Sequence, residues 1–452
     1  MAFLLLAGAL AAAHSSTTIH RPTWDELALV QPYLTARGIS AATLARLLAR
    51  TQAAHAARVR EGDLDHLVFY MLQSTRFTPR PPIEPALSAK ALVEGLEPEP
   101  RAAFLTGATS RDVTVPPAVQ MRITDLMSSF ERPSRDERSV FFSQLVQAAF
   151  PEGPGLAAAV GREYVRTMRF IYRKEFLAPR GAPGSAAVHD LYRERGLSTD
   201  TAVESGFVIH TGLAVLNALE PERRVRRVLV VGPGLDLAPR TGFLEESPPQ
   251  SYQPWAVMDA LVSLGLSRLD DLSVVAADIN PRVVAHLRQV RKAPPSLWLA
   301  SALADDAAVV VAPDYRDYFA QLGRAIGADA PASGLRKVVR VGAPSARALA
   351  AAETLDIVTE RLAGPGFDLV IATNIFPYFD DLELALAMSN IASMTVPGGA
   401  LLHNEGRPVL GEITTAVCLP FEQSRHVTIA TVRGTTAPLA DVVFLHRKAT
   451  RR

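Results

Sequence analysis

The chain has 452 residues, enough for two or three domains, and 48% of them are hydrophobic, as in ordinary globular proteins. Its 47 basic and 46 acidic side chains leave a formal net charge of +1, so no overall field attracts nucleic acid or anionic lipid. The one cysteine, Cys418, excludes an internal disulfide framework and a multi-cysteine metal site. Its apolar neighbours predict a core position, and the ten scattered histidines predict no metal site.

Residues 1–20 form a signal-like segment. Residues 1–13 are mostly apolar and end in small side chains before His14, which is typical of a secretory signal, although no basic residue precedes the run. The run is too short to span a bilayer, so we expect no transmembrane span. The pattern leaves two interpretations open: a segment cleaved on export, or the apolar first helix of a protein that stays in the cytoplasm.

Residues 21–185 are predicted to form a mainly helical accessory domain. Apolar side chains recur there at spacings of three and four, as on one face of a helix. The predicted helices cover residues 25–36, 41–58, 65–74 and 156–176. Proline clusters between residues 79 and 100 interrupt the pattern. The segment 178–185, rich in Pro, Gly and Ser, predicts the boundary with the next domain.

Three polar side chains, Asp63, Asp65 and His66, lie close together around the start of the predicted helix over residues 65–74. Carboxylate and imidazole groups can bind a metal ion, but three of them at this spacing do not fix a coordination geometry. An aspartate is also a good N-terminal cap for a helix. We therefore expect an aspartate cap at the start of a helix over residues 64–74, and no metal site.

Four arginines share one face of the predicted helix 156–176, because they are spaced four, three and four residues apart. They are Arg162, Arg166, Arg169 and Arg173. Such a stripe could capture an acidic substrate or partner, or it could be a solvated face that pairs locally with Glu163 and Glu175. The sequence favours the solvated face.

Residues 186–452 alternate between short apolar strands and helices, which predicts an α/β fold with a doubly wound, mostly parallel sheet. The predicted strands cover residues 228–231, 273–277, 368–372 and 400–403. The predicted helices cover residues 199–219, 254–265, 281–290 and 382–394. Residues 426–433 and 442–446 predict a final antiparallel hairpin. An insertion over about residues 293–347, with a helix at 314–322, either shapes a substrate pocket or elaborates the surface.

Glycine or polar residues follow three of the predicted strands. The first strand ends in the turn Gly232-Pro233-Gly234, another ends in Asp278, and a third is followed by Asn374. Open α/β sheets bind ligands at the carboxyl ends of their strands. A dinucleotide site would need a third glycine where Leu237 stands, and an acid much nearer than Asp278. These departures weaken the case for an NAD(P)-dependent enzyme, which stays an alternative.

The order of the motifs resembles that of class I S-adenosylmethionine (SAM)-dependent methyltransferases. The similar segments are residues 228–236 (motif I), 277–280 (the acidic end of the second strand), 355–357 (the third-strand acid) and 397–402 (a Pro-Gly-Gly turn into a strand). The resemblance covers roughly residues 190–446. A weaker similarity links residues 278–280 and 373–379 to the chemotaxis-receptor (CheR-like) methyltransferases, although Thr373 stands where that family has arginine.

The resemblance implies SAM as the cofactor, and a seven-stranded Rossmann-like sheet with a C-terminal antiparallel hairpin in a domain over residues 186–452. Asp278 would accept hydrogen bonds from both ribose hydroxyls, since a carboxylate offers only acceptor oxygens. Asp356 would face the adenine amino group, and Asn374 would hold the amino-acid end. The implied cofactor-binding residues are Gly232, Pro233, Gly234, Asp236, Asp278, Ile279, Asp356, Ile357, Asn374 and Thr199.

We expect an enzyme that methylates oxygen or nitrogen of a small-molecule or protein acceptor. Thr199 either caps the helix 199–219 or contacts the cofactor, and Tyr378 either orients a substrate or packs beneath the sheet edge. A non-catalytic SAM- or nucleotide-binding scaffold or sensor and an NAD(P)-dependent Rossmann enzyme are the alternatives. The sequence identifies neither the acceptor, nor a catalytic residue, nor the oligomeric state.

Overall fold

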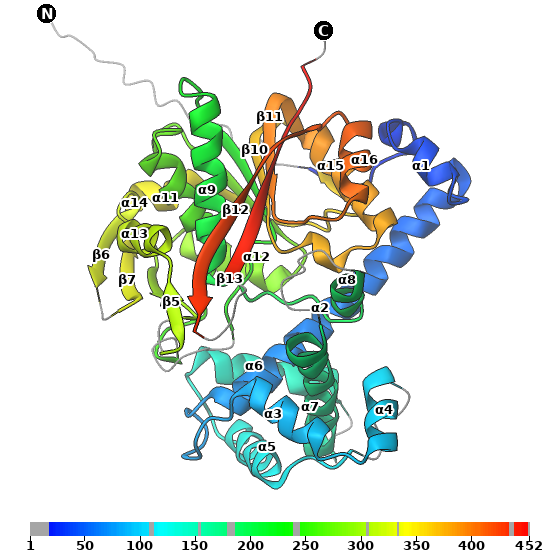
Figure 1. Cartoon of the computed structure of the whole chain (residues 1–452), viewed down its shortest axis with the longest axis vertical. Helices are drawn as coiled ribbons and strands as arrows, with labels where there is room; N and C mark the ends of the chain where they lie inside the picture. Colours follow the sequence, from blue (N-terminus) through cyan, green and yellow to red (C-terminus); the bar gives the residue numbers. More distant parts are fainter. Residues whose placement is uncertain are drawn as a thin grey trace, which may run out of the picture.

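The computed structural model describes residues 18–107, 113–151, 155–178, 186–237, 245–303, 307–331, 334–433 and 438–450. Residues 1–17 of the signal-like segment and residues 179–185 of the predicted boundary lie outside the described residues. Figure 1 shows an α/β body above a smaller group of helices, and one long helix, α2 (Ala41–Gln73), runs through both.

The central sheet has eight strands in the order β5-β12-β13-β11-β10-β2-β3-β8. Their bounds are β2 Arg227–Val231, β3 Ser273–Asp278, β5 Val309–Val311, β8 Leu349–Thr354, β10 Phe367–Ala372, β11 Thr395–His403, β12 Phe421–Val432 and β13 Pro438–Arg447. The strands from β11 to β8 pair in parallel, whereas β13, β12 and β5 join by antiparallel pairing. The predicted α/β class is confirmed, with a mixed sheet. The sheet has one strand more than the seven expected, because β5 comes from the insertion and pairs with β12.

Helices cover both faces of the parallel strands, which explains why these strands read as continuous apolar runs. Side chains of β2 alternate between two buried clusters: Val228 and Val230 face one, while Leu229 and Val231 face the other. The helices of the first cluster are α9 (Val203–Leu219), α11 (Gln253–Ser263) and α12 (Pro281–Val290). Those of the second are α15 (Asp381–Met394) and α16 (Val409–Ala416).

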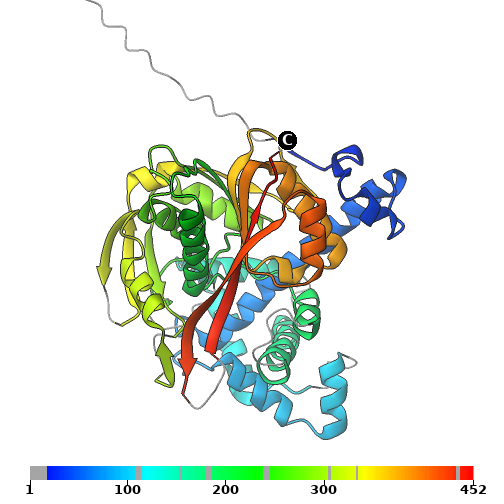
Figure 2. The ribbon, with the colours of Figure 1, turned by 45° about the horizontal axis from the view of Figure 1, so that its top comes forward.

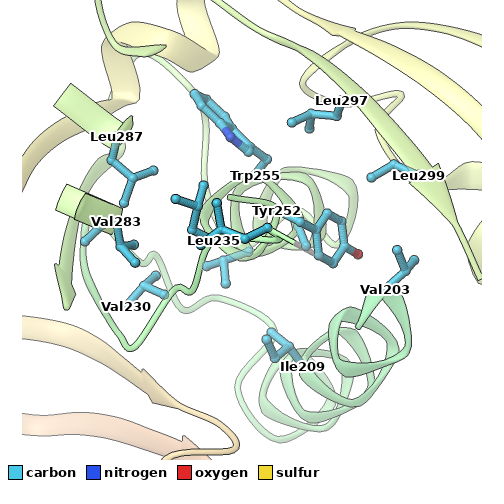
Figure 3. Close-up of a cluster of buried hydrophobic side chains, with 14 of the residues drawn as sticks. Val203, Ile209, Val230, Leu235, Tyr252, Trp255, Val283, Leu287, Leu297 and Leu299 are labelled. Atoms are coloured by element: carbon cyan, nitrogen blue, oxygen red, sulfur yellow. The ribbon is translucent and has the colours of Figure 1, made fainter. Parts of the chain in front are cut away.

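The insertion contributes to the core on the first of these faces. Apart from β5, its strands form a separate antiparallel sheet in the order β4 (Ser296–Ala300), β7 (Arg336–Val341), β6 (Gly327–Pro331). The helix expected over residues 314–322 is α13 (Pro313–Gln321), and α14 (Ala343–Ala348) follows β7. Leu297 and Leu299 belong to the buried cluster drawn in Figure 3, where they lie on the same side as Trp255. The insertion is therefore not only a surface elaboration.

Five shorter helices accompany the second half of α2. They are α3 (Pro85–Glu94), α4 (Pro98–Thr106), α5 (Pro117–Phe130), α6 (Glu137–Ala149) and α7 (Leu156–Tyr172). Three of them begin with a proline, which fits the first helical position because its missing N–H would have no helical partner there. Among the described residues, no helix has the length and apolar character that a membrane span requires.

The helices expected over residues 41–58 and 65–74 are one continuous helix, α2, so the predicted interruption is wrong. Gly62 lies in the interior of this helix. A Cβ atom at position 62 would come 1.9 Å from the carbonyl oxygen of Leu197, so glycine permits a close approach of two chain segments rather than a turn. Tertiary packing here overrides the weak helix propensity of glycine.

Helix α2 contributes to the cores of both parts of the molecule. Its early residues Leu44 and Leu48 belong to the cluster on the second face of the sheet, and the later residues Leu67 and Met71 belong to the cluster that includes α5 and α7. Figure 2 shows the same helix running from the α/β body into the group of helices. A domain boundary near residue 185 therefore stays a prediction.

Cys418 is exposed, so its predicted core position is wrong. It follows α16 in a left-handed conformation with φ of 60°, and its N–H donates to the carbonyl oxygen of Thr415 at 3.1 Å. Its neighbours Val417 and Leu419 are fully buried. The apolar pattern correctly marked a buried segment, but the turn at the helix end leaves the middle residue in solvent.

Candidate functional site

A pocket lies at the carboxyl ends of β2, β3, β8 and β10, the sheet edge at which the sequence predicts a ligand. Its empty space, counted together with the open mouth, is about 740 Å³. The predicted residues that line it are Gly232, Gly234, Asp278, Ile279, Asp356, Ile357, Asn374 and Thr199. Chain segments that are far apart in the sequence therefore meet in one cavity.

The glycine turn after β2 requires glycine at two positions. Gly232 and Gly234 have φ angles of 67° and 72°, a region that other residues rarely adopt. A Cβ atom on Gly232 would come 2.5 Å from a side-chain carbon of Ile375, and one on Gly234 would come 2.3 Å from the carbonyl oxygen of Thr199. Glycine thus lets two other pocket-lining segments approach the turn.

Asp278 is a buried acceptor at the centre of the pocket. Its Oδ2 accepts a hydrogen bond from the backbone N–H of Gly234 at 3.2 Å, and its Oδ1 accepts from the N–H of Asn280 at 2.8 Å. Burial raises the pKa of Asp278 to about 6, against the lowering effect of these two donors, and Asp63 adds a smaller raising effect. Each carboxylate oxygen can accept a further hydrogen bond, so the group suits a vicinal diol.

Asp356 lines the pocket but is also held by α2. Its Oδ2 lies 2.9 Å from Nδ1 of His55, and the other ring nitrogen lies 3.1 Å from Oε1 of Glu383. Burial alone would lower the pKa of His55, but hydrogen bonds and charge from the two carboxylates raise it to about 9. His55 is therefore a buried imidazolium between two acids. No local motif marks it, because Asp356 is 301 residues further along the chain.

Thr199 does not cap α9, so that interpretation is wrong: the helix begins at Val203, and its N-cap residue is Ala202. Residue 199 instead lies in a non-helical segment beside the glycine turn. The N–H of Leu235 donates to the Thr199 carbonyl oxygen at 2.9 Å, and the Thr199 hydroxyl donates to the Leu235 carbonyl oxygen, also at 2.9 Å. This pairing brings Ser198, Asp200 and Thr201 into the pocket wall as well.

Asn374 is exposed at the pocket and has a left-handed backbone with φ of 61°, which asparagine tolerates better than most residues. Its N–H donates to Oδ1 of Asn404 at 2.9 Å, and its own Oδ1 accepts from Nδ2 of Asn404 at 2.7 Å. Asn404 follows β11 and was missed by the sequence reasoning. The two amides fix the backbone at the pocket rim.

Pro233 and Asp236 do not line this pocket. The carbonyl oxygen of Pro233 accepts from the Thr201 hydroxyl at 3.4 Å. Asp236 lines a smaller neighbouring pocket together with Trp298 of the insertion. Leu237, at the place of a third fingerprint glycine, is a buried core residue. The insertion thus reaches the neighbourhood of the site without lining its main cavity.

The acids and histidine at residues 63–66 lie inside α2, so the predicted aspartate cap is wrong. Asp63 accepts from Nδ2 of Asn280 at 3.1 Å, and His66 Nε2 lies 3.1 Å from the Ser198 hydroxyl. Asp65 pairs with Arg166 at 2.8 Å. No group of metal-ligating side chains occurs among the described residues. Asp63 and His66 thus attach α2 to segments that line the pocket, and Asp65 attaches it to α7.

The arginine stripe of α7 is only partly a solvated face. Arg166 pairs with Glu163 at 2.8 Å, as expected, but it also pairs with the buried Asp65 of α2. Arg173 pairs with Glu194 at 2.5 Å. The stripe therefore contributes contacts between helices.

The comparisons with known proteins return methyltransferase structures. No family model and no curated protein matches the chain. N-methyltransferase NodS from Bradyrhizobium japonicum is 12% identical, over 53% of this chain and 94% of that chain, with a TM-score of 0.27. Magnesium protoporphyrin IX methyltransferase (ChlM) from Synechocystis, with bound SAM, is 9% identical over 60% and 100%, with a TM-score of 0.29. A TehB-like SAM-dependent methyltransferase from Corynebacterium glutamicum is 13% identical over 52% and 87%, with a TM-score of 0.25. Because these identities and TM-scores are low, the function is inferred from the residues of the pocket.

Proposed function

We propose that this chain is a class I SAM-dependent methyltransferase that binds SAM in the sheet-edge pocket and methylates oxygen or nitrogen of a small-molecule or protein acceptor. One observation carries the proposal: a single pocket joins the glycine turn, Asp278, Asp356 and Asn374, each at the end of a different strand. The motif resemblance assigns these same positions to one cofactor.

The sheet order supports a ligand at this place. From β2 the chain adds β3 and β8 on one side, then crosses to β10 and β11 on the other. In open α/β sheets the crevice at such a reversal is the usual ligand site. We further propose that the seven strands other than β5 are those of the class I fold, with β12 and β13 as its C-terminal hairpin.

The residues fit an adenosyl ligand. The Asp278 carboxylate would accept from the ribose hydroxyls, and Ile279 and Ile357 would contact the adenine ring. Asp356 would face the adenine edge, with the amino-acid end near Gly232 and Asn374. SAM supplies a methyl group that is already activated on a sulfonium, so the chain would chiefly position the acceptor and exclude water. The helices over residues 21–185 would act as an accessory domain.

Calorimetric titration with SAM and S-adenosylhomocysteine (SAH) tests the proposal. We expect saturable binding of both ligands and at least tenfold weaker binding by Asp278→Ala, because the ribose loses a charged acceptor. Asp271→Ala is the matched control, since this acid is exposed just before the same strand. Absence of heat with either ligand up to about millimolar concentration would contradict the proposal.

The same titration separates the alternatives. Saturable NAD or NADP binding without SAM binding would favour a dinucleotide enzyme, against which the buried Leu237 counts. A scaffold would bind SAM but transfer nothing. Incubation of methyl-labelled SAM with protein and cell extract should label a small molecule or a protein, and Asp278→Ala should abolish the label. Binding without any labelled product would favour the scaffold.

A further inference from the structure

A larger cleft adjoins the cofactor pocket. It encloses about 1810 Å³ including its open mouth, and it shares Ser198, Asp200, Asn374 and Tyr378 with the pocket. Its other walls come from α2, α3, α7, the π-helical turn η2 (Arg173–Leu177) that continues α7, and α8 (Ala186–Arg193). The cleft is therefore the large space through which a second molecule could reach the cofactor.

The strand order places the reacting end of the cofactor at this junction, if the proposed function holds. Along the sheet edge, Asp356 follows β8, Asp278 ends β3, Gly232 follows β2 and Asn374 follows β10. An adenosine held by Asp356 and Asp278 would direct its sulfur end past Gly232 toward Asn374. Asn374 and Tyr378 line both cavities, so the transferred methyl group would face the cleft.

Asp200 lies at the same junction with an uncompensated carboxylate oxygen. Its side chain is 12% exposed, and Oδ2 lies 3.5 Å from Nε2 of His66. Its Oδ1 is buried and has no hydrogen-bond partner among the described residues. A buried charged acceptor is unfavourable unless a donor or a cation satisfies it. The oxygen is therefore suited to a donor brought by a ligand.

The other charges of the cleft are largely paired. Arg195 lies 3.3 Å from Asp65, and its charge also interacts with Asp200. Its guanidinium carbon lies 4.5 Å from the centroid of the Phe170 ring and covers part of that ring. Lys174 and Glu175 pair with each other at 3.1 Å. The carboxylate of Glu84 caps α3 by accepting from two backbone N–H groups, those of Ala86 and Leu87. The charge of Arg195 compensates Asp200 in part, and Oδ1 of Asp200 is the oxygen that a hydrogen-bond donor on a ligand can satisfy.

Aromatic rings line the cleft beside Asp200. Tyr192 and Tyr378 meet edge to face with centroids 5.3 Å apart, and Phe170 meets Tyr192 at 6.1 Å. Phe69 of α2 also lines the cleft. Aromatic walls bind flat apolar groups and also attract cations. The cleft thus combines an apolar surface for a ring with one acidic end.

From this arrangement we infer that the methyl acceptor is an amine on an aromatic body, with its ring against Tyr192 and Phe170 and its nitrogen hydrogen-bonded to Asp200. The ammonium form enters and releases one proton to water. The nitrogen lone pair then forms the new N–C bond while the C–S bond breaks, and the electron pair of that bond stays on sulfur. The positive charge passes from sulfur to nitrogen, beside the Asp200 carboxylate.

Three matched probes test the inference: phenethylamine, 2-phenylethanol and 3-phenylpropionate, each titrated into the SAH-loaded protein. We expect phenethylamine to bind at least tenfold more tightly than the alcohol, with no detectable binding of the acid. Asp200→Asn should abolish the preference for the amine over the alcohol in the SAH-loaded protein. Asp190→Asn, which changes an exposed acid on α8 outside the cleft, should keep this preference. Phe170→Ala should weaken the amine and the alcohol alike.

Results that contradict the acceptor inference differ from the result that would reject the proposed function. Binding of 3-phenylpropionate as tight as that of the amine, or a preference that persists in Asp200→Asn, would overturn the inference. So would a failure of phenethylamine to bind up to about 10 mM. A tenfold loss of SAH affinity in Asp200→Asn would show that Asp200 holds the amino group of the cofactor instead. Failure of the wild-type protein to bind SAH would reject the proposed function itself.

Discussion

At the scale of single residues, Asp278 is the pocket acid whose pKa is raised by burial. It is buried, and two backbone N–H donors compensate its charge only in part, so its pKa rises to about 6. A carboxylate in this state keeps acceptor capacity for a ligand at neutral pH. Protonation would convert one oxygen into a donor and remove part of that capacity.

The elevated pKa predicts the pH dependence of cofactor binding. The affinity for SAH should be constant above about pH 7 and fall as the pH decreases through 6, by about tenfold for each unit well below that value. Asp278→Asn should bind weakly with little dependence on pH over this range. Calorimetry from pH 7.5 to 5 checks this. A wild-type affinity that does not change down to pH 5 would contradict the role of Asp278.

At the scale of elements, α2 shows how packing overrides local preference. A 33-residue helix passes through Gly62 without a break, and the chain around Leu197 lies against it so closely that no Cβ atom fits. The same close approach holds residues 197–201 beside the glycine turn, where they line the pocket. The helix interior and the pocket wall are therefore packed as one unit.

Two glycine-to-alanine substitutions should have opposite effects. Helix propensity favours alanine by about 1 kcal/mol in both cases. At Gly62 the clash with backbone outweighs this gain, so Gly62→Ala should lower the free energy of unfolding by at least about 2 kcal/mol and weaken SAH binding. At Gly411 of α16 nothing lies within 4 Å of the added Cβ, so Gly411→Ala should be neutral or stabilising. Urea unfolding checks both. Equal effects at the two positions would refute the packing argument.

At the scale of the whole molecule, His55 joins the helical part to the sheet. It comes from α2 and bridges Asp356, after β8, to Glu383 in α15. The side chains of His55 and Asp356 are 1% and 3% exposed, so loss of one partner would leave a buried charge unpaired. The contact also fixes the acid expected at the adenine, which links the position of α2 to the cofactor pocket.

The contacts of His55 with Asp356 and Glu383 predict that the free energy of unfolding depends on pH. The pKa of His55 is about 9 in the folded state and 6.5 in the unfolded state, so the folded state binds the proton more tightly. The contribution, about 3 kcal/mol, is fully present below pH 6.5 and is lost as the pH rises through 9. His55→Gln should remove this difference in stability between pH 6.5 and 9.5. His20→Gln should not, because the His20–Glu26 pair is more than one-third exposed. Chemical unfolding at several pH values checks both, and an unchanged pH profile in His55→Gln would contradict the interpretation.

Several elements of the α/β body followed from the sequence because their signals are local. The predicted helix 281–290 coincides with α12, and the predicted strands 228–231 and 273–277 each differ by one residue from β2 and β3. Buried parallel strands read as apolar runs, and the residues after them lie at one edge of the sheet. That is why Gly232, Asp278 and Asn374, which are far apart in the chain, could be assigned in advance to one place, where they do meet. Asp356 was assigned to the same place only by the motif resemblance.

What the sequence by itself determined is thus the order of β2, β3, β10, β11 and the final antiparallel pair, and the chemistry at the ends of the first three of these strands. Periodicity and strand termini depend on neighbouring residues. Only the tertiary structure decided the continuity of α2, the non-helical course of residues 199–202, the exposure of Cys418 and the position of His55 between two acids. These features arise from contacts between distant segments, whose packing outweighs local preferences of about 1 kcal/mol per residue. No pattern within one segment contains that information.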